Sequence, residues 1–182
     1  MTPTLSPAEK HAAAPLFGGR PSVALKELKR RLETELPAQI DFENTRLGLT
    51  GNDAYLKPNG YVISPTPTTD GHLRHLFFGY SVRKVPIGTR GFRGTGIVSI
   101  FLVNERIGKE LQVMDAWDVS GIIGATLMPY LSGCVDASER WAWRELAPQE
   151  ITVLPEAFFE YSGLAMNYQL TQSPSDDLWS VK

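Results

Sequence analysis

The residues best suited to bind a phosphate lie in the glycine- and arginine-rich stretch 88–96, GTRGFRGTG. A P-loop requires a strand, then G-x-x-x-x-G-K-[ST], then a helix, so that backbone amides face the phosphates. Here the glycines precede the strand-like run IVSIFLV, and no Gly-Lys-Ser/Thr follows them at the required spacing. The dinucleotide pattern G-x-G-x-x-G also fails, because Ser99 stands where the third glycine would be. The stretch therefore does not predict a nucleotide site.

Two other roles for this stretch stay open. It is either a solvated connection into the strand or an interaction arm. Arginine is enriched at protein interfaces, and glycine lets two backbones approach closely. The residues that would form the arm are Arg90, Gly91, Phe92, Arg93 and Gly94.

Potential metal ligands gather in DGHLRH, which offers Asp70, His72 and His75. Two residues three apart on a strand point to opposite faces of a sheet, so the two histidines would not converge on one ion. A surface cluster is the simpler interpretation. We expect no metal site and no bound cofactor.

Nucleophilic catalysis would depend on Cys134, the single cysteine of the chain. Its base would have to be His72 or His75, and no G-x-S-x-G elbow is present. One cysteine also excludes an intramolecular disulfide framework. A small Cys/His enzyme therefore remains an alternative hypothesis, and the favoured interpretation is a protein without enzymatic activity.

The composition is that of an ordinary folded protein: 182 residues, 42% hydrophobic and 21% charged, with a net charge of −2. This length suggests one domain. The charge does not favour nonspecific nucleic-acid binding, which wants a strongly basic surface. No apolar run reaches the ~20 residues needed to cross a bilayer, and the first residues lack the pattern of a signal peptide.

The first half of the domain predicts one helix and several strands. Leu25, Leu28, Leu32 and Leu36 form an apolar stripe on a helix over 22–36, which Pro37 should end. Segment 39–48 has the alternation of a short strand, with Ile40 and Phe42 on one face. The strand that starts at 61 should lie at a sheet edge, because Pro65 and Pro67 follow it. Further strands are expected at 74–85 and, covered on both faces at the sheet centre, at 97–103.

The second half predicts a long helix followed by strands. Asn104 should cap a helix over 105–129, which Pro129 ends and which Gly121 and Gly124 weaken enough to suggest a bend or a close approach. Strands are expected at 140–146, 150–156 and 157–170. Trp141 and Trp143 share a strand face and should pack in the core, with a subunit contact as the alternative.

These elements indicate an α+β fold: a mostly antiparallel sheet with two main helices packed on one face. We expect a flexible N-terminal arm at 1–20, a single domain at 21–170 and a polar C-terminal tail at 171–182.

The order and texture of these elements resemble the tail terminator proteins of long-tailed bacteriophages, the minor tail protein U type. The resemblance covers roughly 22–170 and includes no strict motif. The segments that carry it are LKELKRRLETEL, IDFENT, GYVISPTPT, GFRGTGIVSIFLVN, ERIGKELQVMDAWDVSGIIGATL and EITVLPEAFFEYSGLAMNYQL.

The resemblance implies a structural virion protein, assembled in the host cytoplasm and located at the tail or neck. Such proteins form a homohexameric ring that caps the tail tube, stops its polymerisation and docks the head–tail connector protein. DNA would pass through the lumen without sequence readout. The nearest alternatives are a tail-tube protein, a head–tail completion protein of the neck, and a binding adaptor that uses its aromatic strand.

Overall fold

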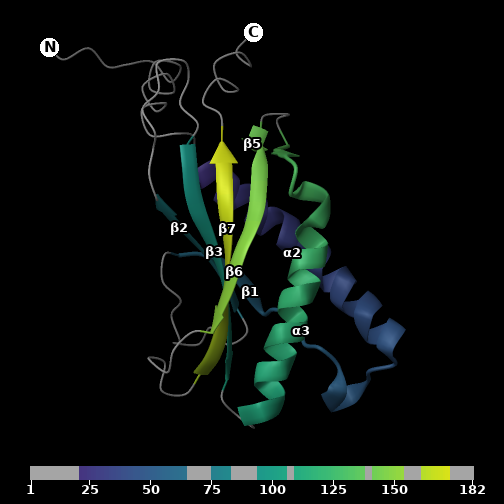
Figure 1. Ribbon diagram of the computed structural model, residues 1–182. Helices are drawn as coiled ribbons and strands as arrows, with labels where there is room; N and C mark the ends of the chain where they lie inside the picture. Colours follow the sequence, from purple (N-terminus) through teal and green to yellow (C-terminus); the bar gives the residue numbers. More distant parts are fainter. Residues whose placement is uncertain are drawn as a thin grey trace, which may run out of the picture.

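The computed structural model describes residues 21–64, 75–82, 94–105, 109–137, 141–153 and 161–172. Within these ranges the fold has two long helices, two short 3-10 helices and seven strands (Figure 1). In chain order they are α2 (Pro21–Leu47), η2 (Gly51–Asp53), β1 (Gly60–Ile63), β2 (His75–Val82), β3 (Gly94–Glu105), α3 (Lys109–Leu127), η3 (Met128–Tyr130), β4 (Cys134–Val135), β5 (Trp141–Trp143), β6 (Glu145–Val153) and β7 (Tyr161–Gln172).

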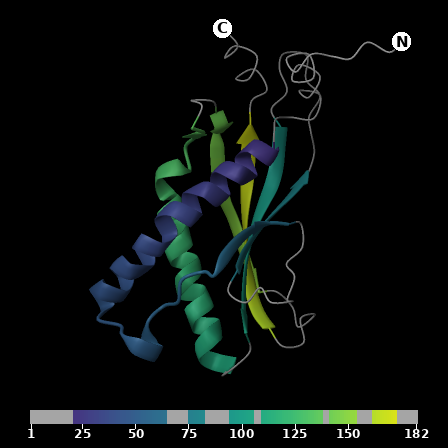
Figure 2. The same cartoon turned by 180° about the vertical axis from the view of Figure 1, so that it is seen from behind.

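Five of the strands form one sheet in the order β1-β2-β3-β7-β6. The β1–β2 pair is parallel and the other pairs are antiparallel, while β4 and β5 form a separate two-stranded sheet. Helices α2 and α3 cross the same face of the large sheet (Figures 1 and 2). The predicted α+β class, with a mostly antiparallel sheet and both main helices on one face, is confirmed.

The core lies between this sheet face and the two helices. Strand β3 is central, as predicted, and pairs with β2 on one side and β7 on the other. Its alternate residues Val98, Ile100 and Leu102 are buried against the helices. On its other face Ile97 is buried, while Ser99 and Phe101 are half-buried.

The expected end of the first helix at Pro37 was wrong. Helix α2 continues through this proline to Leu47. A proline inside a helix costs about 3 kcal/mol, because it removes a hydrogen bond and crowds the preceding turn. Here Ile40, four residues after Leu36, extends the apolar stripe, and both side chains are completely buried. Burial of such side chains contributes about 1.5–3 kcal/mol each and offsets the cost.

The predicted strand at 39–48 was therefore also wrong. Ile40 is buried, but Phe42 is 58% exposed, since side chains two positions apart on a helix point in nearly opposite directions. The helix ends at Gly48, which has a positive φ of 69°. The Gly48 amide donates to the Thr45 carbonyl at 3.2 Å, and the Leu49 amide donates to the Asn44 carbonyl at 2.9 Å. This pair of bonds is a Schellman motif, which terminates helices at a glycine.

The start of the second helix also differs from the prediction. Asn104 is not a helix cap, because it pairs with Ser162 inside β3, which runs to Glu105. Strand pairing with β7 extends along the whole of β3 and outcompetes an early helix start. Helix α3 begins at Lys109 and ends at Leu127, with Pro129 in the 3-10 turn that follows.

Helix α3 packs its apolar side chains into the core. Val119, Ile122, Ile123 and Leu127 are buried, but Met128 is 67% exposed because it lies beyond the helix. A Cβ added at Gly121 or Gly124 would meet nothing within 4 Å, so neither glycine marks a close approach. In the described residues, no helix is long and apolar enough to cross a membrane.

The remaining strands agree with the predictions in position more than in detail. Strand β1 is an edge strand, as expected, but it runs parallel to β2. The predicted strand at 140–146 is divided at Arg144 into β5 and the start of β6. The final pair, β6 and β7, is antiparallel, and β7 continues to Gln172, two residues into the expected tail.

Candidate functional site

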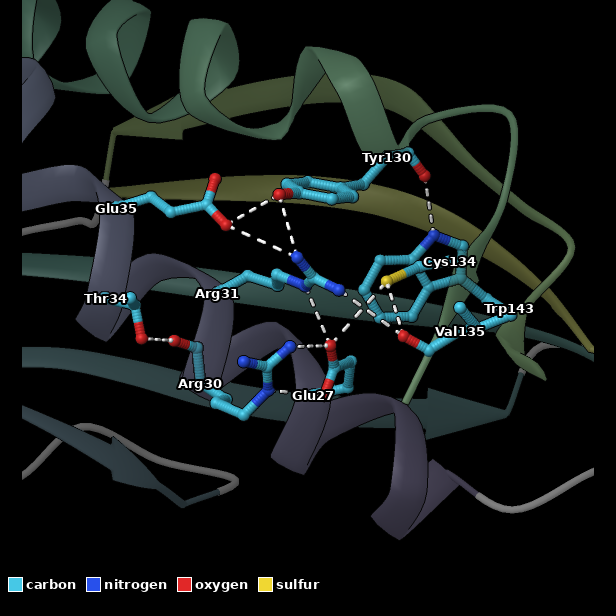
Figure 3. A network of polar contacts seen from close by, with 9 residues as sticks. All are labelled: Glu27, Arg30, Arg31, Thr34, Glu35, Tyr130, Cys134, Val135 and Trp143. Atoms are coloured by element: carbon cyan, nitrogen blue, oxygen red, sulfur yellow. Dashed lines mark hydrogen bonds and ion pairs between the residues drawn. The ribbon is translucent and has the colours of Figure 1, made fainter. Parts of the chain in front are cut away.

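A buried carboxylate, Glu27, lies at the centre of a polar network that connects α2 to the chain after α3 (Figure 3). Arg30 donates to both carboxylate oxygens, from Nε to Oε2 at 2.8 Å and from Nη2 to Oε1 at 2.6 Å. Arg31 donates from Nε to Oε1 at 2.8 Å. Burial by itself would raise the pKa of Glu27, but the two guanidinium groups outweigh it and the pKa is lowered.

Arg31 extends the network to the 3-10 turn η3 that follows α3. Its Nη1 donates to the Tyr130 hydroxyl at 2.9 Å, and its Cζ lies 4.4 Å from the centre of the same ring. The Tyr130 hydroxyl in turn donates to Glu35 Oε1 at 2.6 Å. Trp143 Nε1 donates to the Tyr130 carbonyl at 2.8 Å and holds the 3-10 turn against β5. The network thus fixes how α2 packs against the chain that follows α3.

Cys134 borders this network and is buried. Its thiol is 3.8 Å from Glu27 Oε1 and 3.6 Å from the Val135 carbonyl. Burial raises the pKa of Cys134 to about 11; the Arg31 guanidinium acts in the opposite direction and the Glu27 carboxylate in the same direction as burial. The thiol is therefore protonated at neutral pH, which is the opposite of an activated nucleophile. Asp70 and His72 lie outside the described residues, and His75 begins β2.

A hollow of about 360 Å³ is lined by the C-terminal end of α2, the loop after it and α3, and we call it the helix hollow. Trp117, which is 39% exposed, contributes an indole ring to its surface. Asn44 positions the loop at its border: its side chain accepts from the Tyr55 amide at 2.8 Å and donates to the Tyr55 carbonyl at 3.0 Å. The lining residues are Glu43, Arg46, Leu47, Tyr55, Trp117, Asp118, Gly121, Ile122 and Ala125.

Two carboxylates stand at the helix hollow. Asp118 Oδ2 accepts from the Tyr55 hydroxyl at 2.8 Å. Glu43 Oε2 accepts two hydrogen bonds from Arg46, at 2.8 and 2.6 Å. In the described residues, the second oxygen of each carboxylate accepts no hydrogen bond. The hollow therefore combines an apolar wall with acceptor positions for a cationic donor.

A second hollow, of about 290 Å³, lies on the sheet face opposite the helices and is mostly polar. Ser99 donates to Asn167 Oδ1 at 2.6 Å, and Asn167 Nδ2 lies 3.4 Å from Glu150 Oε1. The lining residues are Ser81, Ile97, Ser99, Gln149, Glu150 and Asn167. Ser99, Asn167 and Glu150 hydrogen-bond to one another across β3, β7 and β6.

The residues predicted for an interaction arm are only partly within the described ranges. Arg90, Gly91, Phe92 and Arg93 lie outside them, and Gly94 is the first residue of β3, opposite Gln172. In the described residues, no group of three or more His, Cys, Asp or Glu side chains could hold a metal ion.

The helix hollow was hard to predict from the sequence. Its residues come from α2, from the loop after it and from α3, and none belongs to a recognisable motif. The spacing of Trp117 and Gly121 on one helix face was the available signal, and it depends on knowing which face stays uncovered. The two tryptophans of RWAWREL differ in burial: Trp143 is in the core, whereas Trp141 is 39% exposed. The Arg144 Cζ lies 3.9 Å from the centre of the Trp141 ring.

Comparison with known proteins leaves the family open. No protein-family model matches the sequence, and no curated protein matches it. Among solved structures, a chain described as "Virion of native gene transfer agent (GTA) particle" is similar over 80% of this chain and 91% of its own length. The sequence identity is 11% and the TM-score is 0.46, a likeness too distant to indicate function.

Proposed function

We propose that this chain is a structural protein of a phage-type virion and that it acts as the tail terminator. Copies of it would form a homohexameric ring that caps the tail tube, stops its polymerisation and docks the head–tail connector protein. The supporting observation is the arrangement of β3, α3, β6 and β7. The strand that directly precedes the long helix is central and pairs along its full length with β7. The chain order of strand, long helix and final strand pair is the one that the sequence resemblance implies.

A closed ring needs heterologous contacts, in which one surface of a copy meets a different surface of the next. The fold offers surfaces at separate places. The helix hollow is on the helical layer, and β3 begins at the end of the sheet away from the C-terminal end of α2 (Figure 1). The net charge of −2 suits a ring through which DNA passes without being held, because phosphate contacts supply most nonspecific affinity.

The geometry of Cys134 argues against the alternative of a Cys/His enzyme. Its thiol is buried, and burial outweighs the nearby Arg31 guanidinium and raises its pKa to about 11, so the thiol is protonated at neutral pH. The surroundings of Cys134 instead have a structural role, since the network around Glu27 holds α2 against the chain after α3.

The test is assembly. Light scattering and negative-stain electron microscopy of the purified protein, together with mass spectrometry of purified virions, should find closed rings and the chain in the particle. A tail-tube protein would instead stack into tubes of many rings. A protein that stays monomeric at all concentrations and is missing from virions would contradict the proposal.

The arm residues give a second test. Replacing Arg90 and Arg93 together with Glu should leave the thermal unfolding midpoint unchanged and reduce ring formation or attachment to tubes. Unchanged assembly would show that the stretch 88–96 is only a connection.

A further inference from the structure

The helix hollow has the surface chemistry of an acceptor for an arginine-flanked aromatic side chain. Its wall includes Trp117, Leu47 and Ile122, and its charged side chains are two carboxylates and one guanidinium. An indole face attracts a guanidinium as well as an aromatic ring. The hollow therefore favours a partner segment that is cationic and carries one apolar anchor.

The carboxylates at this hollow are placed to receive additional donors. Glu43 and Asp118 each use one oxygen for a partner within the chain. In the described residues the other oxygen, Oε1 of Glu43 and Oδ1 of Asp118, accepts no hydrogen bond. An arginine from outside could reach either oxygen without displacing Arg46 or Tyr55.

The stretch 88–96 has this composition. Phe92 stands between Arg90 and Arg93, which give the stretch a charge of +2, and glycines flank all three. The lining of the helix hollow has a formal charge of −1, from two carboxylates against Arg46. The two surfaces are complementary in charge. Each also has an aromatic ring, Phe92 in the stretch and Trp117 in the hollow, and the two rings can stack.

The strands on either side of this stretch end far from the helix hollow. The strands that bound the stretch, β2 and β3, meet where Val82 pairs with Gly96. That end of the sheet is remote from the C-terminal end of α2, which contributes Glu43, Arg46 and Leu47 to the hollow (Figures 1 and 2). A contact between the two surfaces would therefore join one copy to another.

We infer that the helix hollow binds the segment 88–94 of a second copy of this chain. This inference rests on the proposed ring, of which it names the repeating contact. Phe92 inserts beside Trp117, and the flanking arginines bind Glu43 and Asp118. Because the two surfaces differ, each copy contributes its segment 88–94 to one neighbour and binds the segment of the other neighbour in its helix hollow. This is the head-to-tail contact that a ring requires.

Chemical cross-linking tests the proximity. In a Cys134→Ala background, one preparation carries Gly91→Cys and another carries Ala125→Cys, at an exposed position that lines the hollow. When the two are mixed with a short bismaleimide, a linked heterodimer should form. The matched control replaces Ala125→Cys with Glu145→Cys, which is exposed on β6 and faces away from the core. Equal linking of both pairs, or none of the Gly91–Ala125 pair under ring-forming conditions, would overturn the inference.

Binding of a labelled peptide tests the chemistry. The peptide PIGTRGFRGTG, followed by fluorescence anisotropy with the full-length protein, should bind about fivefold more weakly to Glu43→Gln or Asp118→Asn, as expected for lost ion pairs. Trp117→Ala should weaken binding roughly 30-fold, as for an interface anchor. Glu145→Gln should have no effect, and a peptide with both arginines replaced by Glu should not bind.

The outcomes separate the inference from the proposed function. Rings that form normally in Asp118→Asn and Trp117→Ala, with equal peptide binding, would refute the hollow as acceptor and leave the ring standing. Specific peptide binding by a protein that never forms rings and is missing from virions would support the contact between copies and refute the tail terminator.

Discussion

Arg31 and Tyr130 are 99 positions apart in the chain, yet the arginine Nη1 donates to the tyrosine hydroxyl at 2.9 Å. The same guanidinium contacts Glu27, so one side chain joins the buried carboxylate of α2 to the turn after α3. Burial alone would lower the pKa of Arg31, but the hydrogen bond to Glu27 and the surrounding groups raise it, and the side chain stays charged.

Replacement of Arg31 by Ala should therefore lower the free energy of unfolding by about 2 kcal/mol, because Glu27 keeps only one of its two cationic partners. Urea denaturation measures this difference. Lys29→Ala is the matched control. Its ion pair with Glu33 is largely exposed, and its loss should cost no more than about 0.5 kcal/mol. Equal effects of the two changes would mean that the network contributes little.

Glu27 should make stability depend on acid pH. Its pKa in the folded protein lies below the ordinary value of 4.5, so its contribution is complete above that pH. The contribution is lost as the pH falls through the lowered folded value. Urea denaturation of Glu27→Gln should show a deficit at pH 7 that shrinks below pH 4.5. In Glu33→Gln, a change at the surface, a deficit of similar size and pH dependence would contradict this explanation.

Cys134 should make stability depend on alkaline pH. Its pKa rises from 9.0 in the ordinary thiol to about 11 in the folded protein. The stabilising effect of the protonated thiol is therefore complete below pH 9 and is lost as the pH rises toward 11, with a slope of up to about 1.4 kcal/mol per pH unit. Stability curves of Cys134→Ala should be flatter over this window. Rapid alkylation of the native thiol at pH 7 would contradict its burial.

Pro37→Ala should stabilise the protein. The change restores a backbone donor inside α2, and we expect a gain of about 1–2 kcal/mol after the loss of proline's restriction of the unfolded chain. Thermal unfolding followed by far-UV circular dichroism measures it. Ala38→Gly at the adjacent exposed position should instead cost about 1 kcal/mol. A loss of stability in Pro37→Ala would mean that the helix is adapted to the proline ring.

Gly133→Ala should destabilise the protein strongly. Gly133 has φ of 141°, and an added Cβ would lie 2.8 Å from Trp141 Cζ3. We expect a loss of about 2–3 kcal/mol from backbone strain and this clash together. Gly48→Ala separates the two causes, because Gly48 also has a positive φ but nothing lies within 4 Å of the added Cβ. It should cost about 1 kcal/mol. Equal losses would assign the whole effect to the backbone.

The chain's periodic segments could be predicted because their signals are local. The leucine stripe of α2 and the apolar run of β3 each show which face must be buried, and alternation marks the final strand pair. Boundaries were less predictable. Pro37 carries a strong stop signal, but the burial of Ile40 and the glycine cap at Gly48 decide where α2 ends. Asn104 has cap chemistry, but pairing with β7 holds it in a strand.

Neither the Glu27 network nor the helix hollow could be predicted from the sequence. In the sequence Glu27 and Arg31 look like part of an ordinary charged helix face, and only the packing of the chain after α3 places them in a network with Tyr130 and Cys134. Asp118 acquires a partner in Tyr55 only when Asn44 fixes the loop that carries Tyr55.

By itself, the amino-acid sequence determined the class of fold, the central strand and the apolar faces, because hydrophobic periodicity acts within each segment. Tertiary structure alone decided which charges are buried, which tryptophan is exposed and where the helix hollow forms. Those features depend on contacts between residues some 60 to 100 positions apart, such as Tyr55 with Asp118 and Arg31 with Tyr130. Local propensity contains no information about such pairs, since their energy appears only after the chain has packed.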